Sequence, residues 1–183
     1  QWAALELNNA AQVNIKNNTI NDVQQGVYGE GEAIQFWNVE TLDVSGNFIT
    51  NNYQGIYFYS DGVGGTFCGT YGCPIPGGSI SSNSISGNTM FGVKVEAVAS
   101  GGPLDASCNW WGSAAAADVL ASISGDVDAT PWLVDGTDGN LAIGFQPAGA
   151  CTGGPVKVYS DLAETTLVDT YFTNSASRIG GIG

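Results

Sequence analysis

Two aspartates, Asp43 and Asp105, are the residues of this 183-residue chain whose spacing best suits acid–base chemistry. They hold matching places in two copies of an internal pattern, and stacked strands would set their carboxylates about 10 Å apart. That separation lies close to the range that glycoside hydrolases use for a catalytic pair of carboxylates. The alternative is that outward-facing aspartates keep the surface soluble and discourage lateral aggregation. We favour the alternative and expect a chain that is not an enzyme.

The charged residues exclude several classes of protein. The chain has no histidine, so a histidine-based catalytic triad, a facial iron triad and a mixed cysteine–histidine zinc site are ruled out. Seventeen acidic residues against four basic ones give a net charge of −13, which disfavours nucleic acid as a partner and repels polyanionic sugars. No apolar run is long enough to cross a membrane.

Three tyrosines are the best candidates for ligand binding. Tyr28 and Tyr57 recur at the same place in two copies of the pattern, and Tyr59 follows two residues later. Exposed aromatic rings on a rigid face can stack on the rings of a glycan. The alternative is that tyrosines on neighbouring strands stabilise a sheet face.

Four aspartates in a turn-rich stretch are candidate ligands for Ca²⁺: Asp126, Asp128, Asp135 and Asp138. Neither an EF-hand loop nor a nonapeptide repeat accompanies them. We therefore expect no cofactor, and calcium is the alternative.

An internal repeat of 29 residues positions these side chains. The first two copies match in character at ten positions, beginning with Leu5 and Ile34. A third copy begins near Ile80 and a fourth near Leu104, after a glycine-rich insertion at about residues 61–76. Within each copy apolar and polar residues alternate over short stretches, which is typical of strands. Short strands without intervening helices predict turns that stack by parallel pairing around a dry interior.

Asparagines recur in every copy, at spacings of 29, 36 and 26 residues: Asn18, Asn47, Asn83 and Asn109. Stacked asparagines can pass amide hydrogen bonds along a column, and Asn9 and Asn38 would form a shorter second column. The alternative is that asparagine simply favours turns. Both interpretations give these residues a structural role.

The motif N-x-I (residues 18–20, 47–49 and 83–85), followed by G-V/I-Y (26–28 and 55–57), resembles the right-handed parallel β-helix repeats of the pectate-lyase-like superfamily. Residues 104–112 (LDASCNWWG) resemble the terminal turn of many β-helix domains in secreted bacterial and archaeal surface proteins.

The resemblance implies an all-β fold, a right-handed parallel β-helix (a solenoid) of about four turns with a terminal cap, over residues 1–133. It leaves the activity open, because the superfamily holds lyases, hydrolases, epimerases, adhesins and inert scaffolds.

Beyond the repeats the composition changes. An alanine-rich stretch predicts a capping helix at about residues 114–123, with Val119, Leu120 and Ile123 on one side. Residues 134–155 are expected to be a glycine- and proline-rich linker. Residues 156–183 are expected to be a C-terminal extension that forms strands.

The chain has four cysteines: Cys68, Cys73, Cys108 and Cys151. We favour pairing Cys68 with Cys73 and Cys108 with Cys151, although the sequence permits all three pairings. A four-thiolate zinc site is the less favoured alternative, because no C-x2-C pair is present. Disulfides indicate an oxidising compartment, so we expect an extracellular or cell-surface protein.

The first repeat begins by residue 5 with nothing before it to cover its open edge. Either the chain continues before Gln1 or another chain stacks there. The C-terminal extension could add a strand to a neighbouring subunit, and repetition of that contact head to tail builds a filament. We therefore expect a structural or assembly domain that associates with itself. The alternative is a carbohydrate-binding or carbohydrate-active β-helix, related to polysaccharide lyases, hydrolases or epimerases, with a glycan as partner.

Overall fold

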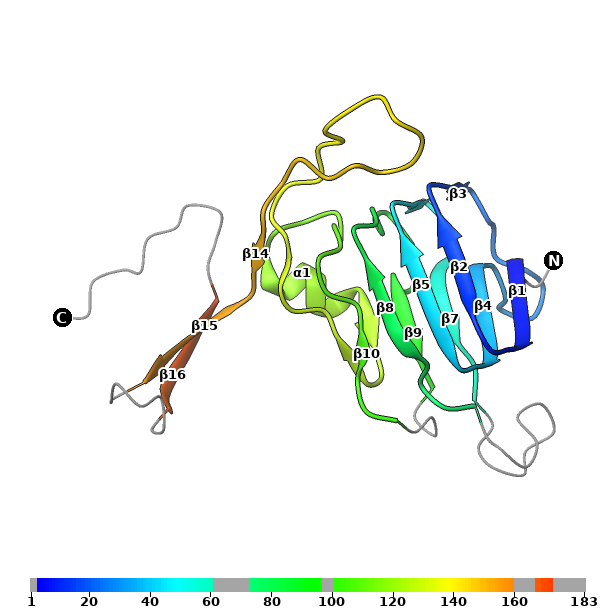
Figure 1. Ribbon diagram of the computed structural model, residues 1–183, viewed down its shortest axis with the longest axis horizontal. Coiled ribbons are helices and arrows are strands. Elements are labelled where there is room, and N and C mark those ends of the chain that lie inside the picture. The colour runs from blue at the N-terminus through cyan, green and yellow to red at the C-terminus, as the bar shows by residue number, and fades with distance from the viewer. Residues whose placement is uncertain (1–2, 61–72, 97–100, 160–166, 173–183) are drawn as a thin grey trace.

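The computed structural model describes residues 3–60, 73–96, 101–159 and 167–172, and it is an all-β structure dominated by parallel sheets (Figure 1). The largest sheet has five parallel strands in the order β1-β4-β7-β9-β11. Its strands are β1 (Ala3–Ala10), β4 (Glu32–Val39), β7 (Gln54–Phe58), β9 (Val93–Val95) and β11 (Ile123–Ser124).

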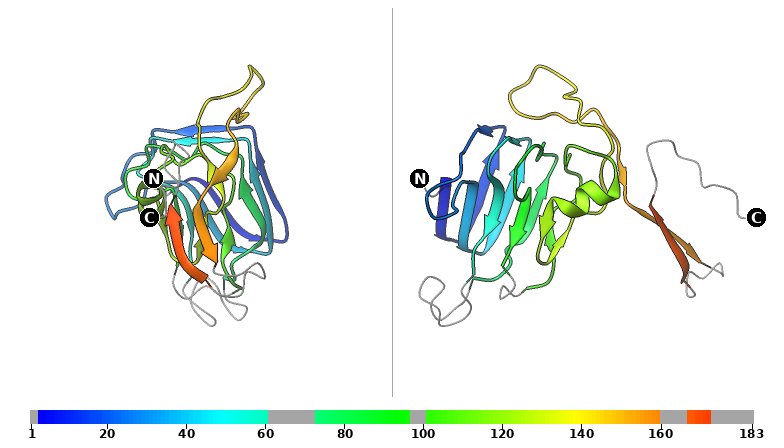
Figure 2. Two further views of the ribbon diagram at one scale, coloured as in Figure 1. Left: turned by 90° about the vertical axis from the view of Figure 1, so that its left-hand side faces the viewer. Right: turned by 180° about the vertical axis from the view of Figure 1, so that it is seen from behind.

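Two further parallel sheets complete the main body. The second contains β2 (Val13–Lys16), β5 (Thr41–Ser45) and β8 (Gly77–Ser81). The third contains β3 (Thr19–Asn21) and β6 (Phe48–Thr50), and isolated parallel bridges continue it through Ser84 to Trp110. The chain visits the three sheets in the same order each time, so that β1, β2 and β3 are followed by β4, β5 and β6. Figure 1 shows the strands of β2-β5-β8 in one row in front of β4, β7 and β9, and Figure 2 shows the second row from behind.

The predicted 29-residue register is confirmed over the first two copies. Leu5 lies opposite Ile34, and Ile20 lies opposite Ile49. In the second sheet Ile15, Val44 and Ile80 stack in one column, and they are 7%, 0% and 0% exposed. These apolar columns from the three sheets meet in one hydrophobic core.

The end of the repeat was aligned wrongly from the sequence. Tyr28 and Tyr57 do not share a column, because β7 pairs with β4 only 22 residues earlier, which sets Gln35 opposite Tyr57. Val27 is 93% exposed and Tyr28 is 88% exposed, in a turn outside the sheets. Burial of one face of a strand fixes its register. Residues 27 and 28 are exposed, so nothing holds them in register with residues 56 and 57.

The asparagine column is continuous. Asn18 donates through Nδ2 to Asn47 Oδ1 at 3.0 Å, Asn47 donates to Asn83 Oδ1 at 2.9 Å, and Asn83 donates to Asn109 Oδ1 at 3.0 Å. The last three side chains are fully buried. Asn38 also donates to Asn9 Oδ1, at 2.6 Å.

A further asparagine column escaped the sequence analysis. Asn52 donates to Asn88 Oδ1 at 3.0 Å, and the backbone N–H of Val23 donates to Asn52 Oδ1 at 3.1 Å. The sequence could have revealed this column, because Asn52 and Asn88 are 36 residues apart, the same spacing as Asn47 and Asn83.

The helix α1 (Ala116–Ala121) is shorter than the predicted range of 114–123. Val119 is fully buried, but Leu120 is 53% exposed, so placing Leu120 on the buried side was wrong. Neighbouring residues on a helix point about 100° apart, and in this short helix the turn of Val119 alone faces the core. Within the described ranges, no helix is long and apolar enough to span a membrane.

Short strand pairs follow. The first is parallel, between β10 (Leu104–Asp105) and β12 (Val127–Asp128). Two more are antiparallel: β13 (Trp132–Leu133) with β14 (Cys151–Gly153), and β15 (Pro155–Tyr159) with β16 (Leu167–Phe172). The last pair lies in the expected C-terminal extension, and its two strands pair with each other.

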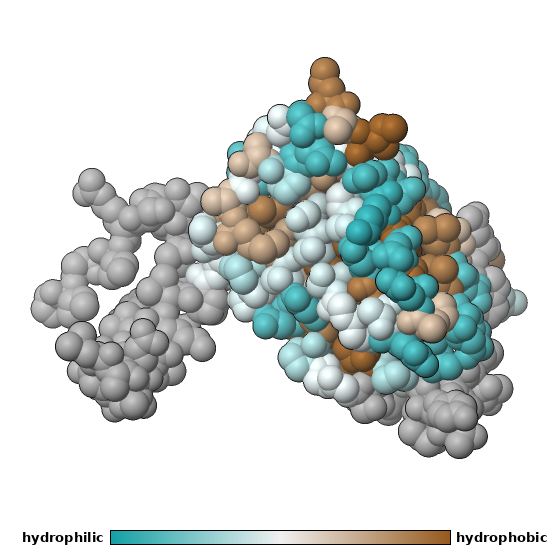
Figure 3. Space-filling view, in the orientation of Figure 1, coloured by the Kyte–Doolittle hydropathy of each residue, from teal (hydrophilic) through white to brown (hydrophobic). Residues whose placement is uncertain are grey.

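The stretch expected to be a linker folds back on the sheets. Phe145 is 1% exposed, its ring meets Phe48 edge-on with centroids 5.3 Å apart, and its N–H donates to Gly46 O at 2.7 Å. The same loop exposes Leu141 and Ile143. Figure 3 shows hydrophobic surface at the top, where Figure 1 has the loop that leads into β14. Buried Phe145 therefore anchors a loop whose composition resembles that of a free linker.

A disulfide holds the end of this loop. It joins Cys108 to Cys151, as predicted. Cys73 is also disulfide-bonded, while Cys68 and most of the glycine-rich insertion lie outside the described residues.

Candidate ligand-binding groove

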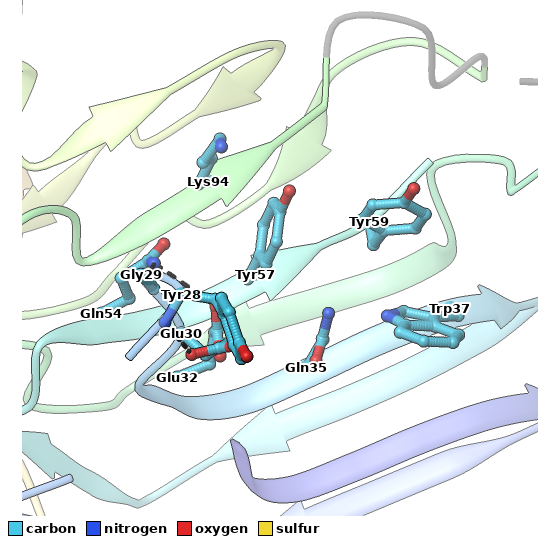
Figure 4. Close-up of a pocket in the computed structure, with 10 residues that line it drawn as sticks. All are labelled: Tyr28, Gly29, Glu30, Glu32, Gln35, Trp37, Gln54, Tyr57, Tyr59 and Lys94. Atoms are coloured by element: carbon cyan, nitrogen blue, oxygen red, sulfur yellow. Dashed lines mark hydrogen bonds between the residues drawn. The ribbon is translucent and has the colours of Figure 1, made fainter. Parts of the chain in front are cut away.

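A groove of about 390 Å³ lies on the outer face of the five-stranded sheet, over β4, β7 and β9 (Figure 4). Four of its lining residues are aromatic: Tyr28, Trp37, Tyr57 and Tyr59. Five others have polar side chains: Glu30, Glu32, Gln35, Gln54 and Lys94.

Strand alternation brings these side chains to one face. On β4, Ile34 and Phe36 point into the core. Successive side chains of a strand point to opposite faces, so Gln35 and Trp37 point outward. Parallel pairing then aligns Gln35 with Tyr57 on β7. It likewise aligns Tyr57 with Lys94 on β9. The floor of the groove is therefore a row of outward positions on three adjacent strands.

The aromatic rings form one wall of the groove. Trp37 and Tyr59 have ring centroids 5.4 Å apart, and the rings of Tyr57 and Tyr59 meet nearly at right angles with centroids 6.2 Å apart. All three are partly exposed. In Figure 4, Tyr57 and Tyr59 stand along one strand, while Gln35 and Trp37 stand along the next. Such a row offers apolar ring faces and polar atoms to the same ligand.

A small charged network occupies the β9 side. Lys94 Nζ lies 3.0 Å from Glu96 Oε1 and 4.5 Å from the centroid of the Tyr57 ring. The Tyr57 hydroxyl donates a hydrogen bond to the same Glu96 oxygen. Burial, and then this hydrogen bond, raise the pKa of Tyr57 far above its usual value. Tyr57 therefore stays protonated and acts as a hydrogen-bond donor, not as a base.

Glu96 responds to the same contacts in the opposite direction. Burial alone would raise its pKa, but the hydrogen bonds from Tyr57 and Lys94 outweigh it and lower the pKa below the usual value. Glu96 is therefore a carboxylate at neutral pH, and it holds Lys94 in place.

Glu32 is a buried carboxylate at the start of β4. It is 4% exposed, and it accepts hydrogen bonds from Gly31 N at 3.0 Å and from Gln54 Nε2 at 3.3 Å. Both donors are neutral. The two ion pairs found in the described part of the chain, those of Lys16 and Lys94, do not involve Glu32. The groove thus holds an acidic side chain without a cationic partner.

Gln35, at the centre of the groove, has an unused hydrogen-bonding group. The residue is 5% exposed, and its buried Oε1 has no hydrogen-bond partner. A half-turn about the terminal bond exchanges the amide oxygen and nitrogen, so the side chain can offer a ligand either an acceptor or a donor.

The structure gathers the three candidate tyrosines, Tyr28, Tyr57 and Tyr59, around this groove, although Tyr28 reaches it from a turn. The candidate aspartates lie elsewhere. Asp43 forms an ion pair with Lys16 at 2.5 Å, and hydrogen bonds from Lys16 and then Ser45 lower its pKa.

Asp105 accepts a hydrogen bond from Ser107 N at 3.0 Å and lies opposite Asp128. Neither Asp105 nor Asp43 lines the groove.

The four candidate calcium ligands do not form a cluster. In the ranges covered by the structure, no group of three or more His, Cys, Asp or Glu side chains is placed to hold a metal ion. Asp128 and Asp135 each accept hydrogen bonds from a threonine two residues later, and Asp138 accepts one from Gln146 N. Asp126 contributes its backbone oxygen, which accepts from Leu104 N. Three of these carboxylates thus stabilise local turns.

Sequence reasoning missed Trp37, Glu32 and Gln35. The signal was the resemblance of Q-F-W at residues 35–37 to Y-F-Y at 57–59, which are 22 residues apart. The 29-residue alignment concealed that offset.

Comparison of the chain with family models, curated proteins and solved structures gives no match. The function must therefore be inferred from the chemistry of the groove.

Proposed function

We propose that this chain is a right-handed parallel β-helix of an extracellular protein, and that its outer sheet face binds a carbohydrate. The fold proposal is supported by the constant order in which the chain visits three parallel sheets, and by side chains that stack one above another. Parallel crossovers are right-handed in almost all proteins. The disulfide between Cys108 and Cys151 agrees with an oxidising compartment.

The observation that carries the binding proposal is the combination of partly exposed rings with an unpartnered amide in one groove. The apolar faces of sugar rings stack on aromatic side chains. Sugar hydroxyl groups donate to and accept from amides and carboxylates, and Gln35, Gln54 and Glu32 supply both kinds of atom. The volume of about 390 Å³ lies within the range of small-ligand sites.

The groove supports binding more than catalysis. Tyr57 is held protonated, and Glu96 is held ionised by Tyr57 and Lys94. A general base and a general acid need pKa values near the working pH. Neither Tyr57 nor Glu96 meets that requirement, so these two groups are better suited to recognition than to proton transfer.

A glycan array screened with the purified protein tests this function, followed by titration of each hit with isothermal titration calorimetry. Trp37→Ala removes a ring from the groove and should weaken binding about fivefold or more, because lost ring contact costs on the order of 1 kcal/mol or more. Tyr53→Ala is the matched control, since Tyr53 is an aromatic residue outside the groove whose hydroxyl accepts from Gln25. Equal affinities of the two variants, or no hit on the array, would refute glycan binding.

Self-association is a second candidate function, favoured by the exposed edge of the sheets. β1, β2 and β3 are the outermost strands of their sheets among the residues described, and Leu5 is 38% exposed there. The asparagine column also ends openly at Asn18, whose Oδ1 accepts no hydrogen bond from the described part of the chain. We propose that a second copy can add strands at this edge and extend the stack, giving a structural or filament-forming role.

Electron microscopy and sedimentation velocity over a range of concentrations test the second candidate. Regular fibres or larger oligomers should form, and Leu5→Lys should suppress them by placing a charge on the exposed edge. A monomer at all concentrations would count against self-association.

A further inference from the structure

The charges around the groove are unbalanced, and this bears on the kind of sugar that fits. Glu30 and Glu32 line the groove, and Glu96 borders it through Tyr57. Lys94 is the one cation among the lining residues. The surroundings of the groove are thus acidic, in a chain whose net charge is −13.

Lys94 is already engaged with neighbouring groups of the chain. Its ammonium lies 3.0 Å from Glu96 and over the ring of Tyr57, with Nζ 4.5 Å from the ring centroid. Its remaining N–H groups can still reach a uronic acid, sulfate or phosphate, but Glu96 already offsets much of its positive charge. The same ligand would bring its own negative charge toward Glu30 and Glu32, which raises its binding free energy.

Glu32 has the opposite property. A buried carboxylate without a cation is unfavourable, and a cation that arrives with a ligand removes that cost. Its two observed hydrogen bonds leave further lone pairs free, because a carboxylate can accept about four. A ligand ammonium can therefore pair with Glu32 without displacing Gly31 or Gln54.

The remaining walls of the groove also suit a cation. The ring of Tyr28 can attract positive charge through its face, whereas the ring of Tyr57 already carries Lys94. Glu30 is fixed at the rim by a hydrogen bond from Tyr28 N at 3.1 Å. Gln35 is only 5% exposed, and its side-chain oxygen Oε1 is an acceptor without a partner on the same face. These groups form an acceptor-rich surface around one aromatic wall.

We infer that the groove selects an amino sugar whose amine is protonated, in preference to its N-acetylated form or to a uronic acid. This inference rests on the proposed carbohydrate binding and specifies its ligand. The ammonium pairs with Glu32, while the sugar ring stacks on the aromatic wall. Acetylation removes the charge, and a uronic acid reverses it.

Isothermal titration calorimetry with three oligosaccharides of equal length tests the inference: glucosamine, N-acetylglucosamine and galacturonic acid tetramers. The protein should bind the glucosamine tetramer roughly tenfold or more tightly than the N-acetylated one at mildly acidic pH, as expected for a hydrogen bond to a charged group. Galacturonate should bind least, and high salt should reduce the preference for the amine only in part, because a buried pair is poorly screened.

Two variants locate the charge that is responsible. Glu32→Gln keeps the shape and removes the charge, so it should abolish the preference for the amine while binding of the N-acetylated tetramer persists. Glu40→Gln is the matched control, because it makes the same charge change outside the groove and should leave the preference intact. Circular dichroism melts of both variants verify that they are folded.

The outcomes separate the two proposals. Equal affinity for the amine and N-acetyl tetramers, tighter binding of galacturonate, or an unchanged preference in Glu32→Gln would overturn the amine inference and leave carbohydrate binding standing. A lysine tetrapeptide that binds as tightly as the glucosamine tetramer would also overturn it, since the sugar ring would then be unnecessary. Binding of none of the three sugars would overturn the amine inference, and the absence of any hit on the glycan array as well would overturn both proposals.

Discussion

Removing one buried asparagine from the column should destabilise the protein much more than removing the exposed one at its end. Asn83 is fully buried, and its side chain takes part in five hydrogen bonds. Its Oδ1 accepts from both N and Nδ2 of Asn47, and its Nδ2 donates to Val44 O, Ser81 O and Asn109 Oδ1. The position therefore links neighbouring turns of the chain.

The expected magnitude follows from the groups that Asn83→Ala leaves behind. The buried backbone N–H of Asn47 loses its acceptor, which costs about 1–3 kcal/mol. The lost side-chain hydrogen bonds and the small void left by truncation add about 1–2 kcal/mol. We expect the free energy of unfolding to fall by about 3 kcal/mol, which lowers the melting temperature by roughly 6–12 °C for a chain of this size.

Asn18→Ala is the matched control, because Asn18 is exposed and donates only to Asn47 Oδ1 and to Lys16 O. Its removal should cost about 0.5 kcal/mol. Urea unfolding followed by circular dichroism, under non-reducing conditions, gives both values if the slopes of the transitions agree. Equal losses in the two variants, or a loss below about 1 kcal/mol for Asn83→Ala, would refute the reasoning that the column stabilises the fold by satisfying buried groups.

Three further predictions concern the core, the disulfide and the acid side of the stability curve. Val44→Asp places a charge in a fully buried column and should cost several kcal/mol in a thermal melt, while an unchanged melting temperature would contradict the inward assignment. Cys151→Ala opens the link to Cys108, which spans 43 residues, and should lower the free energy of unfolding by about 4 kcal/mol; a loss below about 1 kcal/mol in urea would contradict it. The pKa of Asp43 is lowered in the folded chain by its contact with Lys16. This contact therefore stabilises the fold fully above the pKa of an unfolded aspartate, and the contribution is lost as the pH falls through the lowered pKa. Asp43→Asn should therefore make stability fall less steeply in acid, by a small amount because the pair is about half exposed; an identical acid slope would contradict it.

The parts of the fold that the sequence predicts are those with a buried face. Val13 and Ile15 alternate with polar residues, and their partners 29 residues later do the same, so the register of β2 and β5 has one solution. Asn18 and Asn47 mark the same corner of successive copies and identify the column. Burial restricts the residue type at each of these positions, and the restriction is visible as periodicity.

The groove was only partly predictable, because outward positions carry no such restriction. Gln35, Tyr57 and Lys94 stand in one row but share no residue type, so nothing in their identity shows that they are neighbours. The matching G-V-Y and G-I-Y motifs indicated the wrong pairing for Tyr57. Only the shorter 22-residue step from β4 to β7 brings Trp37 and Tyr59 together.

The loop after β13 was mispredicted for a different reason. Glycine is frequent in it, as in a flexible linker, and Phe145 anchors its middle to the sheets. Its contact with Phe48 joins residues 97 positions apart in the sequence. Local composition carries no information about a contact at that separation.

A crystal structure of the protein grown with the glucosamine tetramer tests the central claim most directly. We predict a sugar ring stacked against Trp37 or Tyr59, with its amine nitrogen within hydrogen-bonding distance of a Glu32 oxygen. A tetramer bound only elsewhere on the surface, or an empty groove in crystals where the sugar saturates the protein in solution, would contradict it.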